Sequence, residues 1–212
     1  MSQRLFLGLV PLGPVDPEIL RSLRLALKKF FPLSVRILTP HPLPPHTFHL
    51  GRGQYHSNKI LEYLVNEVNP RALRLLGITA VDLYIPILTF VFGEAQLGGR
   101  AAVVSLFRPR GDAGGIRPPK LVLLKRLIKL SLHELGHTFG LPHCRQEGCL
   151  MGFSYNLEKL DEKPLAFCRY CQVLLGDFFD ELGLSHRKPR YAEIPLPGAA
   201  SPVAGSGRKR RR

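Results

Sequence analysis

Two hydrophobic periods alternate along the chain, and together they predict an α/β order of elements. Residues 4–12 are almost all apolar and are bounded by glycine and proline, which is typical of a buried strand. Leu20, Leu23 and Leu27 then recur at the spacing of one helix face, behind Asp16 as a predicted N-cap. The same reasoning predicts strands at 4–12, 34–40 and 72–78, a hairpin within 88–107 turning at Gly98-Gly99, and helices at 17–31, from a Ser57 cap to Asn69, at 119–139 and at 171–182.

This order of strands and helices predicts one α/β domain with a mixed sheet. We expect the domain to span residues 1–187, with an irregular stretch between Gly140 and Cys171. From 188 to 212 the chain is rich in proline, glycine, alanine and serine and ends in basic residues, so we expect a disordered basic tail there. The apolar fraction of 45% excludes a wholly disordered protein.

The apolar runs are too short for a membrane span, which needs about 20 residues. The apolar start of the chain lacks a small-residue cleavage pattern, so it reads as a strand and not as a signal peptide. We therefore expect a cytoplasmic protein without membrane partners, in a compartment where disulfides are unusual.

The net charge of +14 is concentrated partly at the end of the chain, where residues 208–212 carry five positive charges. A basic surface attracts polyanions, so nucleic acid is a possible partner through the tail. The alternative is a solvated tail and a basic surface that serve solubility alone.

The stretch "HELGHTFGLPH", residues 133–143, combines metal-binding side chains at helical spacing. His133 and His137 are four residues apart, so both rings lie on one helix face and can share an ion. Gly140 permits the left-handed turn that would end the helix and bring His143 back as a third ligand. Three histidines leave the fourth position of a tetrahedral zinc open for water, and Glu134 beside the first ligand is placed to act as general base.

Four cysteines follow, Cys144, Cys149, Cys168 and Cys171, in two close pairs. Two pairs of thiolates fit a closed, structural zinc site. Two disulfides are the alternative, although Cys168 and Cys171 are too close for an easy bridge. A redox role is a further alternative, but the sequence around this CxxC is not thioredoxin-like.

The chain closely resembles the archaemetzincins. The resemblance rests on "HELGHTFGLPH", "CRQEGC", Met151 and "CRYC", and extends to "RGQYHS" and "FVFGEAQLGGRAAVVSLFR". It implies a zincin-like, metzincin-type fold, in which helices pack a mixed twisted sheet with an active-site helix and a methionine turn. It also implies two zinc ions per chain: a catalytic one on His133, His137 and His143 and a second on the four cysteines, with Met151 at the turn beneath the first.

We therefore expect a zinc-dependent peptidase that hydrolyses peptide bonds through a zinc-bound water, with Glu134 as general base. By resemblance to other zincins, a sheet edge within 88–96 would hold an extended peptide or protein substrate by strand addition. The alternative is a zinc-stabilised binding protein with little or no hydrolysis. The intact Glu134 favours the enzyme, because a binding module does not need a base there.

Overall fold

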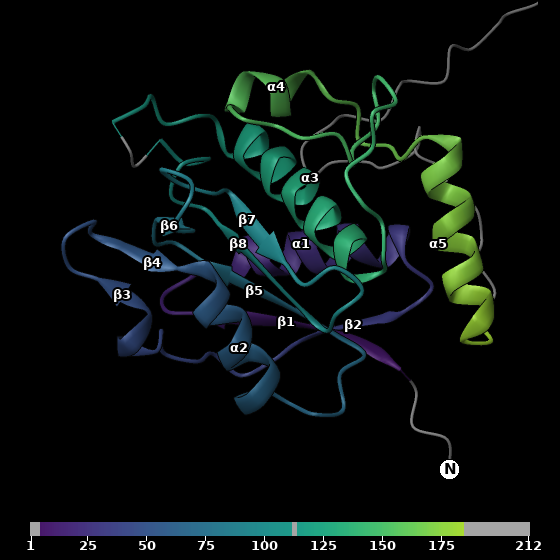
Figure 1. The fold of residues 1–212 in the computed structure, drawn as a ribbon, viewed down its shortest axis with the longest axis horizontal. Helices are drawn as coiled ribbons and strands as arrows, with labels where there is room; N and C mark the ends of the chain where they lie inside the picture. Colours follow the sequence, from purple (N-terminus) through teal and green to yellow (C-terminus); the bar gives the residue numbers. More distant parts are fainter. Residues whose placement is uncertain (1–4, 112–113, 185–212) are drawn as a thin grey trace, which may run out of the picture.

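The computed structural model describes residues 5–111 and 114–184, in which a mixed sheet is covered by helices (Figure 1). The predicted basic tail, 188–212, lies outside the described residues. The strands are β1 Phe6–Leu12, β2 Ser34–Ile37, β3 Phe48–His49, β4 Gln54–His56, β5 Arg74–Thr79, β6 Leu83–Tyr84, β7 Gly93–Ala95 and β8 Ala101–Ser105. The helices are α1 Pro17–Phe30, α2 Ser57–Glu67, α3 Lys120–Thr138, α4 Leu157–Glu162 and α5 Arg169–Glu181, and a short 3-10 turn covers Pro45–Thr47.

The main sheet has the strand order β2-β1-β5-β8-β7. The first four strands are parallel, and β7 runs antiparallel to β8 at the edge of the sheet. Every residue of β1, β5 and β8 is buried, as expected for central parallel strands that are covered on both faces. The predicted mixed α/β sheet is therefore confirmed, including the hairpin that turns at Gly98-Gly99, where Gly98 has a φ of +66°.

Helices cover both faces of this sheet (Figure 1). Side chains of α1, α3 and α5 form one hydrophobic core with one face of the sheet, and side chains of α2 form a second core on the opposite face. Helix α3 packs against β7 and β8, so its C-terminal half lies beside the edge strand. The fold thus places the predicted metal-binding helix next to a free sheet edge.

Helix starts follow the predicted capping at α1 but not at α2. The Asp16 carboxylate accepts a hydrogen bond from the backbone N–H of Glu18 at 2.8 Å, ahead of Pro17 at the first helical position. The prediction of Ser57 as a cap is wrong: Ser57 is the first helical residue and His56 is the N-cap, without a side-chain cap bond. The buried Ser57 hydroxyl instead hydrogen-bonds the Tyr84 carbonyl at 3.2 Å, because tertiary partners are within reach.

Three short strands and one helix were not predicted from the sequence, and one predicted helix begins earlier than expected. A small second sheet, in the order β3-β4-β6, lies partly in residues 40–57, which are rich in histidine and proline and favour a loop, and partly in the segment after β5. Helix α4 lies inside the stretch that we expected to be irregular, and α5 begins at Arg169, two residues before the predicted start. Among the described residues, the structure has no helix that is long and apolar enough to cross a membrane.

Candidate functional site

The three histidines of the predicted catalytic site meet at the C-terminal end of α3. His133 and His137 lie one turn apart, with ring centroids 4.7 Å apart. Gly140, with a φ of +90°, reverses the chain, and the N–H of Leu141 bonds back to the Gly136 carbonyl at 3.0 Å. This turn brings His143 to the other two, and the ring nitrogens of the three histidines lie within 4.8 Å of one another.

The orientation of two rings fits a cation. His133 Nδ1 lies 2.9 Å from the Leu150 carbonyl oxygen, and His137 Nδ1 lies 2.7 Å from that of Leu141. A carbonyl only accepts, so each Nδ1 carries the hydrogen and each neutral ring presents a bare Nε2. The two Nε2 atoms face each other at 3.1 Å. Tetrahedral zinc with ordinary Zn–N bonds would separate them by about 3.3 Å.

Burial keeps these rings in the form that binds metal. It lowers the pKa of His133 to about 3 and also lowers the pKa of His137 and His143. At near-neutral pH all three side chains are therefore neutral imidazoles, which have the free lone pair that metal coordination needs. The donor set and its protonation both fit zinc.

Glu134 is buried between α3 and the edge strand. A Cβ atom at Gly93 of β7 would lie 2.8 Å from Glu134 Oε1, so the carboxyl group lies directly against the strand backbone. Burial, followed by the nearby charge of Glu94, raises the pKa of Glu134 to about 8. A carboxyl group with a raised pKa beside a cation site can accept and return a proton.

Met151 has no exposed surface and packs against helix α3. Its sulfur packs against Gly136 of α3, and a Cβ atom at Gly136 would lie only 2.5 Å from it. Gly136, directly before His137, is thus the point where the helix touches the methionine. The contact explains the need for glycine in the last turn of this helix, because glycine otherwise lowers helix stability.

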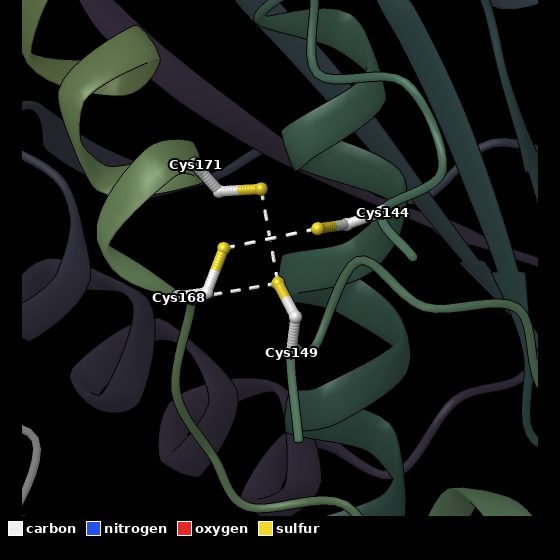
Figure 2. Close-up of side chains that lie close together, drawn as sticks. All are labelled: Cys144, Cys149, Cys168 and Cys171. Carbon is white, nitrogen blue, oxygen red and sulfur yellow. Dashed lines mark hydrogen bonds between the residues drawn. The ribbon is translucent and has the colours of Figure 1, made fainter. Parts of the chain in front are cut away.

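The four cysteines converge, as Figure 2 shows, although they come from two separate stretches of chain. Cys144 and Cys168 have their sulfur atoms 3.7 Å apart, as do Cys149 and Cys171, and all four are free thiols. Tetrahedral zinc with 2.3 Å Zn–S bonds would separate the sulfur atoms by about 3.8 Å. Burial raises the pKa of Cys149 and Cys171, so a cation is needed to hold them as thiolates there.

One short segment, 141–152, belongs to both clusters. His143 and Cys144 are neighbours, and the Cys144 N–H bonds the Met151 carbonyl at 3.0 Å. Leu150 orients His133 through its carbonyl, while its own N–H bonds Ala166 at 2.9 Å in the stretch that leads to Cys168. Movement of the cysteine cluster would therefore move the histidine cluster.

A cavity of about 700 Å³ opens onto the histidines and Glu134. Its walls are mainly apolar and come from the segment before β7, from β7 itself, and from the segment after the methionine turn. Glu94, Phe153 and Tyr155 also line this cavity, although the sequence pattern does not mark them as site residues. Phe153 packs edge-on against His143 with ring centroids 5.4 Å apart. Four other histidines, His41, His46, His49 and His56, are close in sequence but do not form a metal cluster: among the described residues, the groups that could hold a metal are the two above.

A family model, two curated relatives and a solved structure that match this chain indicate one peptidase family. Residues 24–176 match the model of peptidase family M54. An archaemetzincin of Methanocaldococcus jannaschii is 38% identical over 169 residues, which cover 79% of this chain and 90% of that protein. An archaemetzincin of Methanopyrus kandleri is 44% identical over 133 residues, covering 63% of this chain and 72% of that protein. The crystal structure of Methanopyrus kandleri archaemetzincin matches with a TM-score of 0.74 at 35% identity, covering 84% of this chain and 96% of that one.

Proposed function

Since this chain belongs to peptidase family M54, the archaemetzincins, and is a zinc-dependent peptidase, we propose that His133, His137 and His143 hold its catalytic zinc and that Glu134 is the general base. The family resemblance and the zincin-like fold read from the sequence are confirmed by these matches. The observation that carries the residue assignment is the pair of bare Nε2 atoms facing each other at 3.1 Å beside a buried carboxyl group.

The zinc, Glu134 and two backbone carbonyls have separate roles in peptide hydrolysis. Zinc at such a site polarises the scissile carbonyl and makes a water molecule more acidic. Glu134 takes a proton from the attacking water and returns it to the leaving amine. The Leu150 and Leu141 carbonyls hold two of the three rings in the orientation that this needs.

The substrate binds along β7 in this proposal. Ser105 N–H bonds the Phe92 carbonyl at 2.9 Å and Gln96 N–H bonds the Ala101 carbonyl at 3.0 Å, which fixes which residues pair with β8. The alternate residues, Gly93 and Ala95, therefore turn their N–H and C=O groups to the free edge. An extended peptide can add to these groups, beside Glu134 and along the cavity.

We further propose that a second zinc ion is bound by Cys144, Cys149, Cys168 and Cys171 and has a structural role. The sulfur spacing and the four thiols support a closed tetrahedral site without a position for water. Free thiols serve as ligands in a reducing compartment, which supports the cytoplasm as the place of action. Nucleic acid binding by residues 188–212 stays a prediction outside the described residues.

The glutamate substitution Glu134→Gln tests the catalytic assignment. It keeps the shape of the side chain but cannot accept a proton, so cleavage of a peptide library should fall by about 100-fold or more. Zinc content should stay the same, because the histidines are unchanged. The exposed Glu67→Gln is the matched control and should retain parental activity.

Mass spectrometry of the digest, with and without a chelator, gives the rates. A Glu134→Gln protein as active as the parent would exclude Glu134 as the base. A parent protein that cleaves nothing in the library would favour the alternative of a binding protein that has kept the site.

A further inference from the structure

The loop between β6 and β7, residues 85–92, forms one wall of the cavity. Few backbone hydrogen bonds hold this loop. The Leu88 N–H donates to the Ile85 carbonyl at 3.1 Å, and the Val91 N–H donates to the Leu83 carbonyl at 3.0 Å. Ile87 and Leu88 are exposed by 86% and 40%, so core packing does not fix this part of the loop. Something else must hold it.

Arg52 and Gln54 hold the loop backbone from one side. One Arg52 Nη2 atom donates to the Leu88 carbonyl at 2.9 Å and to the Thr89 carbonyl at 3.0 Å. Gln54 Nε2 donates to the same Thr89 carbonyl at 3.0 Å, while its Oε1 atom accepts from Arg52 Nε at 2.9 Å. Two side chains that lie more than thirty residues away in sequence thus grip two adjacent carbonyls.

Asp82 and Arg108 hold the loop through the Phe90 ring. Arg108 makes a two-pronged ion pair with Asp82, with both N···O distances at 2.8 Å, and its guanidinium lies 3.7 Å from the centroid of the Phe90 ring. Asp82 Oδ2 also accepts from Gln54 Nε2 at 2.8 Å, which joins the two halves into one network. Gln54 and Asp82 are buried, with 7% and 9% exposed surface.

Gln54 and Asp82 form the buried centre of this network, and Arg52 and Arg108 reach it from the surface. Such a network of hydrogen-bonded polar side chains fixes geometry more than it adds stability. This one fixes a loop whose apolar side chains line the substrate cavity and lead directly into β7. We propose that Arg52, Gln54, Asp82 and Arg108 are positioning residues that preform this wall for the peptide substrate. The proposal rests on the proposed function, because the occupant of the cavity is the substrate of that site.

A binding wall that is already ordered loses less conformational entropy when the substrate binds, so binding costs less free energy. Loss of the network should therefore weaken substrate binding without disturbing Glu134 or the histidines. β7 itself is paired with β8, so the reacting end of the site stays in place. The expected result is a rise in KM with little change in kcat.

The test compares Arg52→Gln with Arg100→Gln. Arg100 is a matched control, since it also clamps a loop through backbone carbonyls, those of Val65, Val68, Asn69 and Ala72, but does not line the cavity. Both variants should melt at a lower temperature. Only Arg52→Gln should raise KM, by about tenfold, for a peptide that the parent cleaves in a library digest. Asp82→Asn, which removes the charge that Arg108 and Gln54 share, should act in the same direction.

Amide hydrogen exchange of residues 85–92 is the second measurement and does not depend on hydrolysis. Faster exchange in Arg52→Gln but not in Arg100→Gln would support the proposal. An unchanged KM in both Arg52→Gln and Asp82→Asn, or an equal rise in Arg100→Gln, would overturn it. A parent that cleaves no library peptide would defeat the proposed function instead; exchange would then decide the positioning role, and unchanged exchange in Arg52→Gln would refute it.

Discussion

Replacing Gly136 by alanine tests how closely the active-site helix sits on Met151. The new Cβ atom would lie 2.5 Å from the Met151 sulfur, 3.1 Å from its terminal methyl carbon and 3.4 Å from Leu141 Cδ1. Met151 and Leu141 have no exposed surface, so the methionine can relieve the contact only by repacking within the core. The substitution should therefore strain the contact between the helix and the methionine turn.

Two effects of opposite sign set the magnitude. Alanine favours a helix interior over glycine by about 1 kcal/mol, and overpacking a filled core costs about 1–3 kcal/mol. The free energy of unfolding should thus fall by up to about 2 kcal/mol, or the melting temperature by up to about 8 °C for a domain of this size. Gly176 of α5 is the control, because nothing lies within 4 Å of a Cβ atom placed there. Gly176→Ala should stabilise the protein by about 1 kcal/mol.

Urea unfolding at a fixed zinc concentration measures both variants, and a double-mutant cycle with Met151→Ala identifies the cause. In the Met151→Ala background the clash is gone, so Gly136→Ala should become neutral or stabilising, with a coupling energy of at least about 1 kcal/mol. Additive effects of Gly136→Ala and Met151→Ala would refute the reasoning. So would a Gly136→Ala protein as stable as the Gly176→Ala one.

Four other outcomes are expected. Elemental analysis should find two zinc ions per chain, and one zinc with oxidised cysteines would exclude the second site. A mild chelator should remove the histidine-bound ion first, since only that site is open to water; metal release followed with spectroscopy of the cobalt-substituted protein checks the order. Cys168→Ser should lower the melting temperature and also weaken metal binding at the histidines, because segment 141–152 belongs to both clusters, and unchanged melting would contradict this. Deletion of residues 188–212 should leave melting and zinc content unchanged but weaken salt-dependent binding to nucleic acid, and a large loss of stability would show that the tail is docked.

The main helices and strands and the two groups of metal-binding side chains could be predicted from the sequence, because residues close together in the chain determine them. Asp16 and Pro17 mark the start of α1 whatever surrounds them, and the period of leucines sets its buried face. The spacing of His133 and His137 needs only helix geometry. Gly140 predicts the turn that leads to His143, and in the structure this glycine has the expected positive φ.

Pairings between distant residues left no such local signal. Ser57 has the chemistry of a cap, but its hydroxyl bonds Tyr84 and Glu94, which no local rule places nearby. Strands β3, β4 and β6 have three residues or fewer, too short for a hydrophobic period. Glu94 reads as an ordinary strand residue until the fold shows it on the cavity wall.

The shortness of the edge strand has a consequence for self-association. An unpaired strand edge is a template for other copies of the same chain, and long, flat edges promote aggregation. β7 presents only Gly93 and Ala95 to such a partner before the Gly98-Gly99 turn redirects the chain. A few residues of an extended peptide can use that edge beside Glu134, whereas a foreign sheet would gain too few backbone bonds to persist. If the substrate binds as proposed, the short β7 edge serves a peptide better than it serves another copy of the chain.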